Sequence, residues 1–491
     1  MQISSFISPA HARFISGKYA IRTPLQLLSN IERGDQSTLQ LAVDASRMAE
    51  AYPENPIFPQ AGDVIAVLPE NSQEHISSLQ KYLNACEHDT FFLSGRYESD
   101  EGRFYRELDA LTFVCLNPIR LETLVRLKEK VQQMSEIPAF ISRSVRILDR
   151  LLRIHAQAPD RCKQILQHCH LTDLLGAFPS LLTLQDICDT QKGNYRRVYT
   201  ISGISRDSRG IAQTIQFLLA LGVHYQVPKE GFNPGTTYEG TASGYLRRLI
   251  ESSTSSDPQV ECFVQPRSFG PPEKNSLHIP EQFPPKVDAA FFNKLRMPLL
   301  LLANGSGISG IRAVLEERSY WKQQGYSIGS SSLLFGIRNR RQDYIYQQDL
   351  LEYQKQGIID RIVLAESRPS KGLKQYVQHV LMTGAFNHEL KAFFEARSVI
   401  IICGDRRMGQ MIVDGCLPIL LPQISPERLP DQLRHTEFIH PKKFEWAKKE
   451  IADLKAQSLL IRSTSGSRYI KKKNLSLDMI LEGLNLLHPS I

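Results

Sequence analysis

The chain has 491 residues, of which 42% are hydrophobic and 22% are charged, and its formal net charge is +8 at pH 7. This length exceeds one ordinary hydrophobic core, so we expect two or three domains with the composition of a soluble globular protein. The longest apolar runs, such as residues 297–303, are too short for a transmembrane segment, and the small excess of Lys and Arg is too dispersed for a nucleic-acid-binding surface.

The cysteines tell more about the cellular compartment of the protein than about a metal or catalytic site. Eight are scattered without a CxxC pair, and no secretory signal is visible, so we expect reduced thiols in a cytoplasmic protein. Cys162, His168, Cys169 and His170 lie close together in the sequence, as zinc ligands do. Their spacing matches no common zinc finger, and the segment has a helical pattern, so we predict no metal site.

The first part of the chain combines strand and helix patterns. Residues 1–36 predict a polar lead-in, and short strands are expected at 38–43 and 63–68. Residues 71–190 carry apolar side chains at helical spacing, which predicts a helical insertion.

A second strand-rich stretch runs over residues 197–269 and is rich in Tyr, Thr, Val and Gly. Five prolines in residues 269–285 then predict a linker. We therefore expect one β-barrel-like domain, formed by residues 37–70 and 191–285 and split in sequence by the helical insertion.

From residue 296 to residue 491, apolar strands alternate with helices. The strands are expected at 299–303, 332–336, 360–365 and 399–403. The helices are expected at 311–324, 348–356, 375–382 and 407–417. This alternation predicts a doubly wound parallel sheet with helices on both faces.

A glycine-rich turn follows the first of these strands. Gly305, Gly307 and Gly310 allow close approach of the backbone to a ligand, and a helix starting near Ile311 would offer free N–H groups to a pyrophosphate. Glycines serve ordinary tight turns as well, so this turn alone does not establish a dinucleotide site.

Phosphate ligands follow the third strand, at the edge of the sheet where ligands bind in such folds. Ser367, Arg368 and Lys374 suit an adenosine 2′-phosphate, and Tyr376 could stack on adenine. Taken alone, such a loop is more often an ordinary surface. Cys403 ends the fourth strand at the same edge, although a buried cysteine is more often an inert apolar residue.

The second barrel stretch contains an alternating strand. Arg197 and Tyr199 share one face, where they could meet a phosphate and a flat ring, and Thr200 lies on the other. An ordinary half-buried strand is the commoner explanation of such alternation. Residues 240–246 then lead into a helix, which offers a second phosphate-binding turn.

In this order, the segments resemble the NADPH-dependent diflavin reductases, which include NADPH–cytochrome reductase, the sulfite reductase flavoprotein and the reductase region of nitric oxide synthase. The resemblance runs from about residue 37 to at least residue 417. Further segments that carry it are residues 61–71, 178–180, 262–269, 335–339 and 343–346.

The resemblance implies a ferredoxin–NADP reductase-like fold, with an antiparallel β-barrel that binds FAD, a helical connecting insertion and an α/β domain that binds NADP(H). Arg197 would bind the FAD pyrophosphate, Tyr199 would pack on the isoalloxazine, and Thr200 replaces the family's Ser near flavin N5. Backbone groups would bind the FAD phosphates at Gly240, Ala242 and Ser243.

The same resemblance implies the NADPH ligands and the catalytic groups. The nucleotide phosphates would be bound at Gly305, Ser306 and Gly307. The 2′-phosphoadenosine would be bound by Ser367, Arg368, Lys374, Tyr376 and Gln378. The groups that support hydride transfer would be Thr200, Cys403, Asp405 and Asp478.

Three departures from the family pattern are visible. Gly310 replaces the proline of the family's Gly-Thr-Gly-Ile-Ala-Pro turn, and Ile480 stands where an aromatic covers the flavin. No FMN-domain sequence precedes residue 37.

We therefore expect an FAD-dependent NADPH oxidoreductase that passes electrons to a separate flavodoxin-like, iron–sulfur or haem carrier. The alternative is a catalytically impaired reductase-fold protein that acts as a binding or regulatory module. A plain ferredoxin–NADP reductase is disfavoured, because its small members lack the helical insertion.

Overall fold

The computed structural model describes residues 21–33, 36–46, 59, 61–84, 90–94, 103–207, 212–221, 225–252, 258–265, 295–434, 440–457 and 460–465. The chain divides into two compact units. The first contains residues 1–26, 66–198 and 220–263, and the second contains residues 27–65, 199–219 and 264–491. The predicted linker at 269–285 lies outside the described residues.

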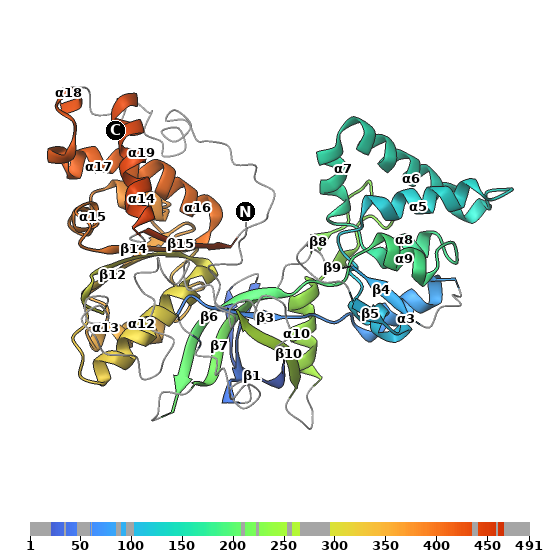
Figure 1. Ribbon diagram of the computed structural model, residues 1–491, viewed down its shortest axis with the longest axis horizontal. Coiled ribbons are helices and arrows are strands. Elements are labelled where there is room, and N and C mark those ends of the chain that lie inside the picture. Colours follow the sequence, from blue (N-terminus) through green and yellow to red (C-terminus); the bar gives the residue numbers. More distant parts are fainter. Residues whose placement is uncertain are drawn as a thin grey trace, which may run out of the picture. The chain divides into compact units, whose positions relative to one another are not determined.

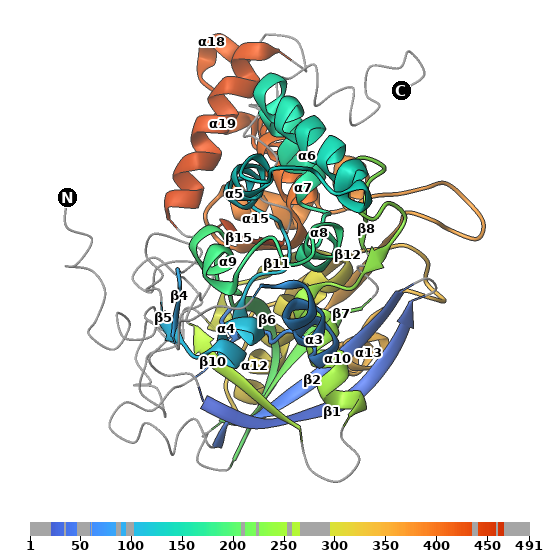
Figure 2. The ribbon, with the colours of Figure 1, turned by 90° about the vertical axis from the view of Figure 1, so that its right-hand side faces the viewer.

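Six strands close into a barrel in the order β1-β10-β3-β6-β7-β2. They are β1 (Ile21–Arg33), β2 (Gln36–Asp44), β3 (Val64–Val67), β6 (Arg197–Arg206), β7 (Ala212–Ala220) and β10 (Gln259–Gln265). Figure 2 shows β1 and β2 as long, curved strands lying side by side. Closure of the sheet removes exposed strand edges.

The predicted lead-in over residues 1–36 is wrong for residues 21–33, which form β1. The strand pairs antiparallel with β10, and Pro24 lies opposite Gln259. A proline normally argues against a strand, and Leu27 and Leu28 are both 45% exposed, so the local pattern lacks a clear apolar face. The strand forms because it pairs with β10, which lies more than 200 residues later in the sequence and cannot be inferred from the local pattern.

Helices and a short ribbon lie between β3 and β6 in the sequence and enclose a hydrophobic core of their own. The ribbon pairs β4 (Phe91–Leu93) with β5 (Arg103–Tyr105). The helices are α3 (Gln73–Tyr82), α4 (Glu107–Phe113), α5 (Leu121–Gln132), α6 (Ala139–Gln157), α7 (Pro159–Leu166), α8 (Leu171–Ala177) and α9 (Leu184–Thr190). Cys162 and Cys169 are buried in this core, and no group of three or more metal-binding side chains occurs among the described residues.

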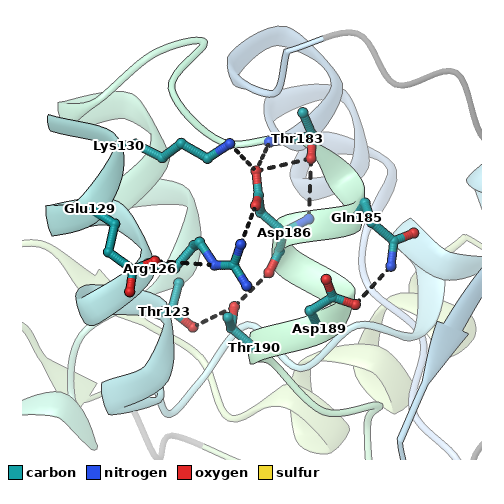
Figure 3. A network of polar contacts seen from close by, with 9 residues as sticks. All are labelled: Thr123, Arg126, Glu129, Lys130, Thr183, Gln185, Asp186, Asp189 and Thr190. Carbon is teal, nitrogen blue, oxygen red and sulfur yellow. Dashed lines mark hydrogen bonds and ion pairs between the residues drawn. The ribbon is translucent and has the colours of Figure 1, made fainter. Parts of the chain in front are cut away.

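Buried Asp186 connects two of these helices (Figure 3). Its carboxylate accepts hydrogen bonds from the backbone N–H and hydroxyl of Thr183, both at 3.0 Å, and thereby completes a capping box at the start of α9. Arg126 and Lys130 of α5 each approach the same carboxylate at 3.5 Å. A residue in the first turn of α9 therefore also binds α5.

A short segment leads from the barrel's β7 towards the next helix. It pairs β8 (Tyr225–Gln226) with β9 (Thr237–Tyr238), and α10 (Thr241–Glu251) follows directly. The His170 and Tyr238 rings stack at 4.2 Å, and the Tyr238 hydroxyl donates to Asp173 at 2.6 Å. These contacts fix the chain just before α10.

The α/β part contains a parallel sheet in the order β13-β12-β11-β14-β15. Its strands are β11 (Leu299–Asn304), β12 (Ser331–Ile337), β13 (Arg361–Glu366), β14 (Val399–Asp405) and β15 (Leu460–Ser465). The short helical elements are η3 (Gly305–Gly307), η4 (Ile412–Cys416) and η5 (Pro426–Arg428). The α-helices are α12 (Ile308–Gln323), α13 (Gln347–Lys355), α14 (Val377–Met382), α15 (Asn387–Phe394), α16 (Arg406–Met411), α17 (Leu417–Ile424), α18 (Asp431–Arg434) and α19 (Pro441–Ala456).

Figure 1 shows α12 and α13 on one face of this sheet and α14 to α17 with α19 on the other. Residues 299–303 of the central strand β11 are at most 2% exposed, as expected for a parallel strand covered on both faces. The predicted two-sided arrangement is confirmed. Within the described ranges, no helix combines the length and apolar character of a membrane span.

Candidate cofactor-binding site

The glycine turn after β11 is shaped by contact with β14. Gly305 has a φ of +52°, and residues 305–307 form one turn of 3₁₀ helix before α12 begins at Ile308. A Cβ atom on Gly307 would lie 2.4 Å from both the Cys403 carbonyl oxygen and the Gly404 Cα. Gly307 is therefore required for close packing of two backbones, in addition to any approach of a ligand.

Asn304 locks the turn to the end of β14. Its Oδ1 accepts a hydrogen bond from the Asp405 N–H at 2.7 Å. Gly404 has a φ of +141°, and a Cβ there would lie 1.9 Å from the same oxygen. The Ser309 hydroxyl also donates to the Ser306 carbonyl at 2.8 Å, so side chains brace the turn that has Gly310 in place of a proline.

The beginning of α12 suits an anion. No side chain of the described residues caps its first turn, and Ser306 is exposed beside it. Uncapped N–H groups and the helix dipole together favour a phosphate at this end. The structure thus places the predicted residues Gly305, Ser306 and Gly307 in one phosphate-compatible turn.

The loop after β13 continues the sheet for two residues and then leaves it. Ser367 donates to the Ile337 carbonyl from both its backbone N–H, at 2.9 Å, and its hydroxyl, at 3.2 Å. The Arg368 N–H donates to the Arg338 carbonyl at 2.7 Å. The side chain of Arg368 is exposed at this edge, where a 2′-phosphate ligand would need it.

The far end of this loop brings two of the predicted residues, Lys374 and Tyr376, into contact. The Lys374 ammonium lies 5.0 Å from the centroid of the Tyr376 ring, and this ring meets His379 edge-on at 5.3 Å. Burial, followed by the charge of Lys374, lowers the pKa of His379. Gln378 lies in the first turn of α14, next to Tyr376. A cation beside an exposed ring suits the phosphate and the base of an adenine nucleotide.

Cys403 and Asp405 lie at the same edge but differ in environment. Cys403 is 2% exposed in β14. The exposed Asp405 caps α16, because its carboxylate accepts from the N–H groups of Arg407 at 2.8 Å and Met408 at 3.4 Å. This cap gives Asp405 a structural role that the sequence had not indicated. Asp478 and Ile480 lie outside the described residues.

In the barrel, Arg197, Tyr199 and Thr200 are consecutive or alternate residues of β6 and are all partly exposed. The Arg197 guanidinium lies 3.3 Å from the centroid of the Tyr195 ring, and the Tyr199 ring lies 5.4 Å from that of Phe217. Arg197 and Tyr199, two of the predicted ligands, are thus each held by a neighbouring ring.

The second phosphate-binding turn lies at the start of α10. Gly240 is the N-cap, and no described side chain bonds to the free N–H groups of the first turn. Ser243 donates to the Gly240 carbonyl at 3.1 Å, and Ala242 is buried. The backbone groups of this turn therefore fit a pyrophosphate, as those of α12 do.

Sequence reasoning missed two groups of charged residues. Arg312 is only 8% exposed, although it lies within α12, and it donates to Asp349 at 2.6 Å and to the Ser202 carbonyl of β6 at 2.8 Å. The sequence signal that could have revealed Arg312 is a charged residue within an apolar helical run. Three arginines also follow β12 directly, at positions 338, 340 and 341, beside the Arg368 loop.

The chain is similar in sequence to known oxidoreductases. Residues 301–414 match the family of oxidoreductase NAD-binding domains. NADPH–cytochrome P450 reductase of Drosophila melanogaster is 24% identical over 393 residues, which cover 77% of this chain and 49% of that protein. The reductase of the same name from Homo sapiens is 24% identical over 365 residues, which cover 71% of this chain and 47% of that protein. The chain thus spans about half the length of these relatives.

The closed barrel, the parallel sheet and the match to an oxidoreductase NAD-binding domain together fit the ferredoxin–NADP reductase-like fold. Within this fold, the chain is similar in sequence to the NADPH–cytochrome P450 reductases over about half of their length.

Proposed function

We propose that this chain oxidises NADPH through bound FAD and passes the electrons to a separate carrier protein. The observation that carries the proposal is the edge of the parallel sheet. There the uncapped start of α12 lies at the end of β11, and the Arg368 loop follows β13, so phosphate-compatible groups occur at two strands of one sheet. NADP(H) carries a pyrophosphate that suits the start of α12 and a 2′-phosphate that suits the Arg368 loop.

Each part of the chain has its own role in this proposal. Residues 296–491 bind NADPH, and the barrel, to which we now add β1, binds FAD. Arg197 and the α10 turn bind the FAD pyrophosphate, and the Tyr199 ring packs on the flavin. FAD and NADPH supply the redox chemistry when they are bound, and the protein orients them.

Three residues would support the transfer itself. The Thr200 hydroxyl would offer a hydrogen bond to the flavin, and Cys403, which lies near the end of β14 at the ligand-binding edge, would lie beside the nicotinamide. We assign Asp405 as a positioning residue, because its carboxylate already caps α16. Asp478 stays a prediction from the family resemblance.

The electron acceptor is a further part of the proposal. The relatives are named for a cytochrome acceptor, and for this chain we propose a flavodoxin-like, iron–sulfur or haem carrier. We also propose a cytoplasmic location, which is supported by the seven described cysteines, none of which forms a disulfide.

Spectroscopy of the purified chain tests this function. The protein, as isolated or after incubation with FAD, should show flavin absorbance that NADPH bleaches under anaerobic conditions. Arg197→Ala should lose the bound flavin, whereas Arg146→Ala, at an exposed position of α6, should keep it. A colourless wild-type chain that FAD cannot reconstitute would refute the proposal and support the binding-module alternative.

A further inference from the structure

The loops after β12 and β13 leave the sheet side by side. The two strands are parallel neighbours, and Ile337 and Glu366, the last residue of each, are register partners. Beyond them, residues 338–343 and 367–376 are connected by the backbone bond from Arg368 to Arg338. The loop that carries the predicted 2′-phosphate ligands therefore lies against the arginine-rich loop after β12.

The Asn339 side chain is one of the groups that join these loops. Its Nδ2 donates to the Arg368 carbonyl at 3.1 Å and to the Ser370 hydroxyl at 3.0 Å. Its Oδ1 accepts from the Arg341 N–H at 2.9 Å, which fixes the orientation of the amide. Asn339 thus uses both ends of its amide, one on its own loop and one on the Arg368 loop.

The other end of the Arg368 loop is fixed by Glu366. Its backbone carbonyl accepts from the Gln375 N–H at 2.8 Å, and its carboxylate accepts from the Arg340 N–H at 3.0 Å. Between these two anchors the loop turns at Gly372, which has a φ of +95° and open space on the side where a Cβ atom would point. The middle of the loop therefore depends on contacts at its ends.

The hydrogen bonds made by Asn339 are exposed to solvent, and this exposure determines whether they affect the stability of the chain or the conformation of the loop. Arg368 and Ser370 lie at the surface, where water can replace a lost partner, so the bonds from Asn339 add little to the free energy of unfolding. They do restrict the conformations of residues 368–370 before a ligand arrives. A ligand that binds Arg368 then loses less conformational entropy, which strengthens its binding.

We propose that Asn339 is a positioning residue for the 2′-phosphate of NADPH and thereby sets the preference for NADPH over NADH. The inference rests on the proposed function, since it requires Arg368 to bind that phosphate. Asn339 itself does not touch the phosphate in this proposal; it acts through the backbone of residues 368–370. Its removal should therefore affect ligands with a 2′-phosphate and spare those without one.

Calorimetric titration tests this without the need for turnover. The probes are adenosine 2′,5′-bisphosphate and 5′-AMP, which differ only in the 2′-phosphate. Asn339→Ala should weaken bisphosphate binding by about three- to tenfold and leave 5′-AMP binding unchanged. Ser370→Ala should have a smaller effect, because the bond to the Arg368 carbonyl remains. Gln342→Ala, at an exposed position of the same loop, should match the wild type.

Steady-state kinetics with ferricyanide as acceptor supply a second measurement, in which Asn339→Ala should raise KM for NADPH and leave KM for NADH and both kcat values unchanged. Equal weakening of both titration probes would show a general structural role and overturn the inference, as would wild-type selectivity in the variant. A wild-type chain that does not distinguish the two probes would instead refute the choice of NADPH in the proposed function. These outcomes separate the two proposals.

Discussion

Close contacts of side chain and backbone determine the shape of the sheet edge where β11 and β14 end. Gly307 and Gly404 leave no room for a Cβ atom, because each lies against the other's segment or against Asn304. Asn304 in turn binds the Asp405 N–H, and Asp405 caps α16. The turn that differs from the family's proline-containing sequence is therefore held by a chain of polar contacts that runs from β11 to α16.

A largely buried carboxylate lies further along α12. The Glu317 side chain is 17% exposed, and its Oε1 accepts from the Ala61 N–H at 3.1 Å. Burial raises the pKa of Glu317 to about 7, and Asp63 and Glu316 add to this rise, while Arg206 and the Ala61 N–H oppose it. The charged form is therefore less favourable in the folded chain than in the unfolded chain.

The stability of the chain should consequently depend on the ionisation of Glu317. Its contribution is fully present below pH 4.5, the ordinary pKa, and is lost as the pH rises through about 7. The loss approaches about 3 kcal/mol, because a pKa difference of one between the folded and unfolded chain corresponds to about 1.4 kcal/mol. Glu317→Gln should therefore flatten the fall in the free energy of unfolding between about pH 5 and pH 8, measured with urea.

Glu352→Gln, at an exposed position of α13, is the matched control and should keep the wild-type pH profile. An unchanged profile in Glu317→Gln would show that this carboxyl titrates in the folded chain as it does in the unfolded chain.

Among the helices, buried Asp186 stabilises the start of α9 and also binds α5. It completes the capping box of α9 and pairs with two cations of α5 (Figure 3). Asp186 is the N3 residue of this capping box and Thr183 is its N-cap, so the removal of Asp186 costs part of the roughly 1 kcal/mol that a whole N-terminal cap contributes. It also removes the carboxylate that pairs with Lys130 and Arg126, of which Arg126 keeps Glu129 at 3.7 Å.

Asp186→Ala should therefore lower the free energy of unfolding by roughly 1–3 kcal/mol in urea denaturation. Asp189 lies on the same helix, and its exposed carboxylate accepts a hydrogen bond from Gln185. Asp189→Ala should therefore change the free energy of unfolding by less than about 0.5 kcal/mol. Equal effects of the two substitutions would contradict the special role of Asp186.

The elements differ in how far the sequence predicted them. Strands β11, β12 and β14 followed from continuous apolar runs, because burial on both faces leaves a strong local signal. Strand β1 depends on its pairing with β10, and β15 pairs only with β14 at the edge of the sheet. Neither strand therefore has a continuous apolar run that would predict it from the sequence. The expected helix at 407–417 is interrupted by the π-helical turn η4, which composition does not show.

The positions of several candidate residues in the fold were predictable for a similar reason. Gly305, Ser367 and Arg368 follow strand ends directly, so the sheet alone fixes their place at one edge. Asn339 and Arg312 act through partners that are distant in sequence or lie on another element, and a single sequence does not show such partners. The cap formed by Asp405 likewise depends on where α16 begins.

At the scale of the whole molecule, the two cofactors should use separable sets of residues. Arg197 lies in β6 and Gly240 at the start of α10, whereas Arg368 lies in the loop after β13. A ligand that binds only the folded chain raises its stability by about 2.7 kcal/mol when its concentration is about 100 times Kd. FAD and adenosine 2′,5′-bisphosphate should therefore each raise the temperature of thermal unfolding, each through its own residues.

Crossed substitutions make this measurable. Arg197→Ala should abolish the shift caused by FAD and keep the shift caused by the bisphosphate, and Arg368→Ala should do the reverse. Arg146→Ala should keep both shifts, which controls for the loss of any arginine. If Arg197→Ala removed both shifts, the bisphosphate would depend on the barrel as well, and the assignment of the 2′-phosphate to the loop after β13 would be wrong.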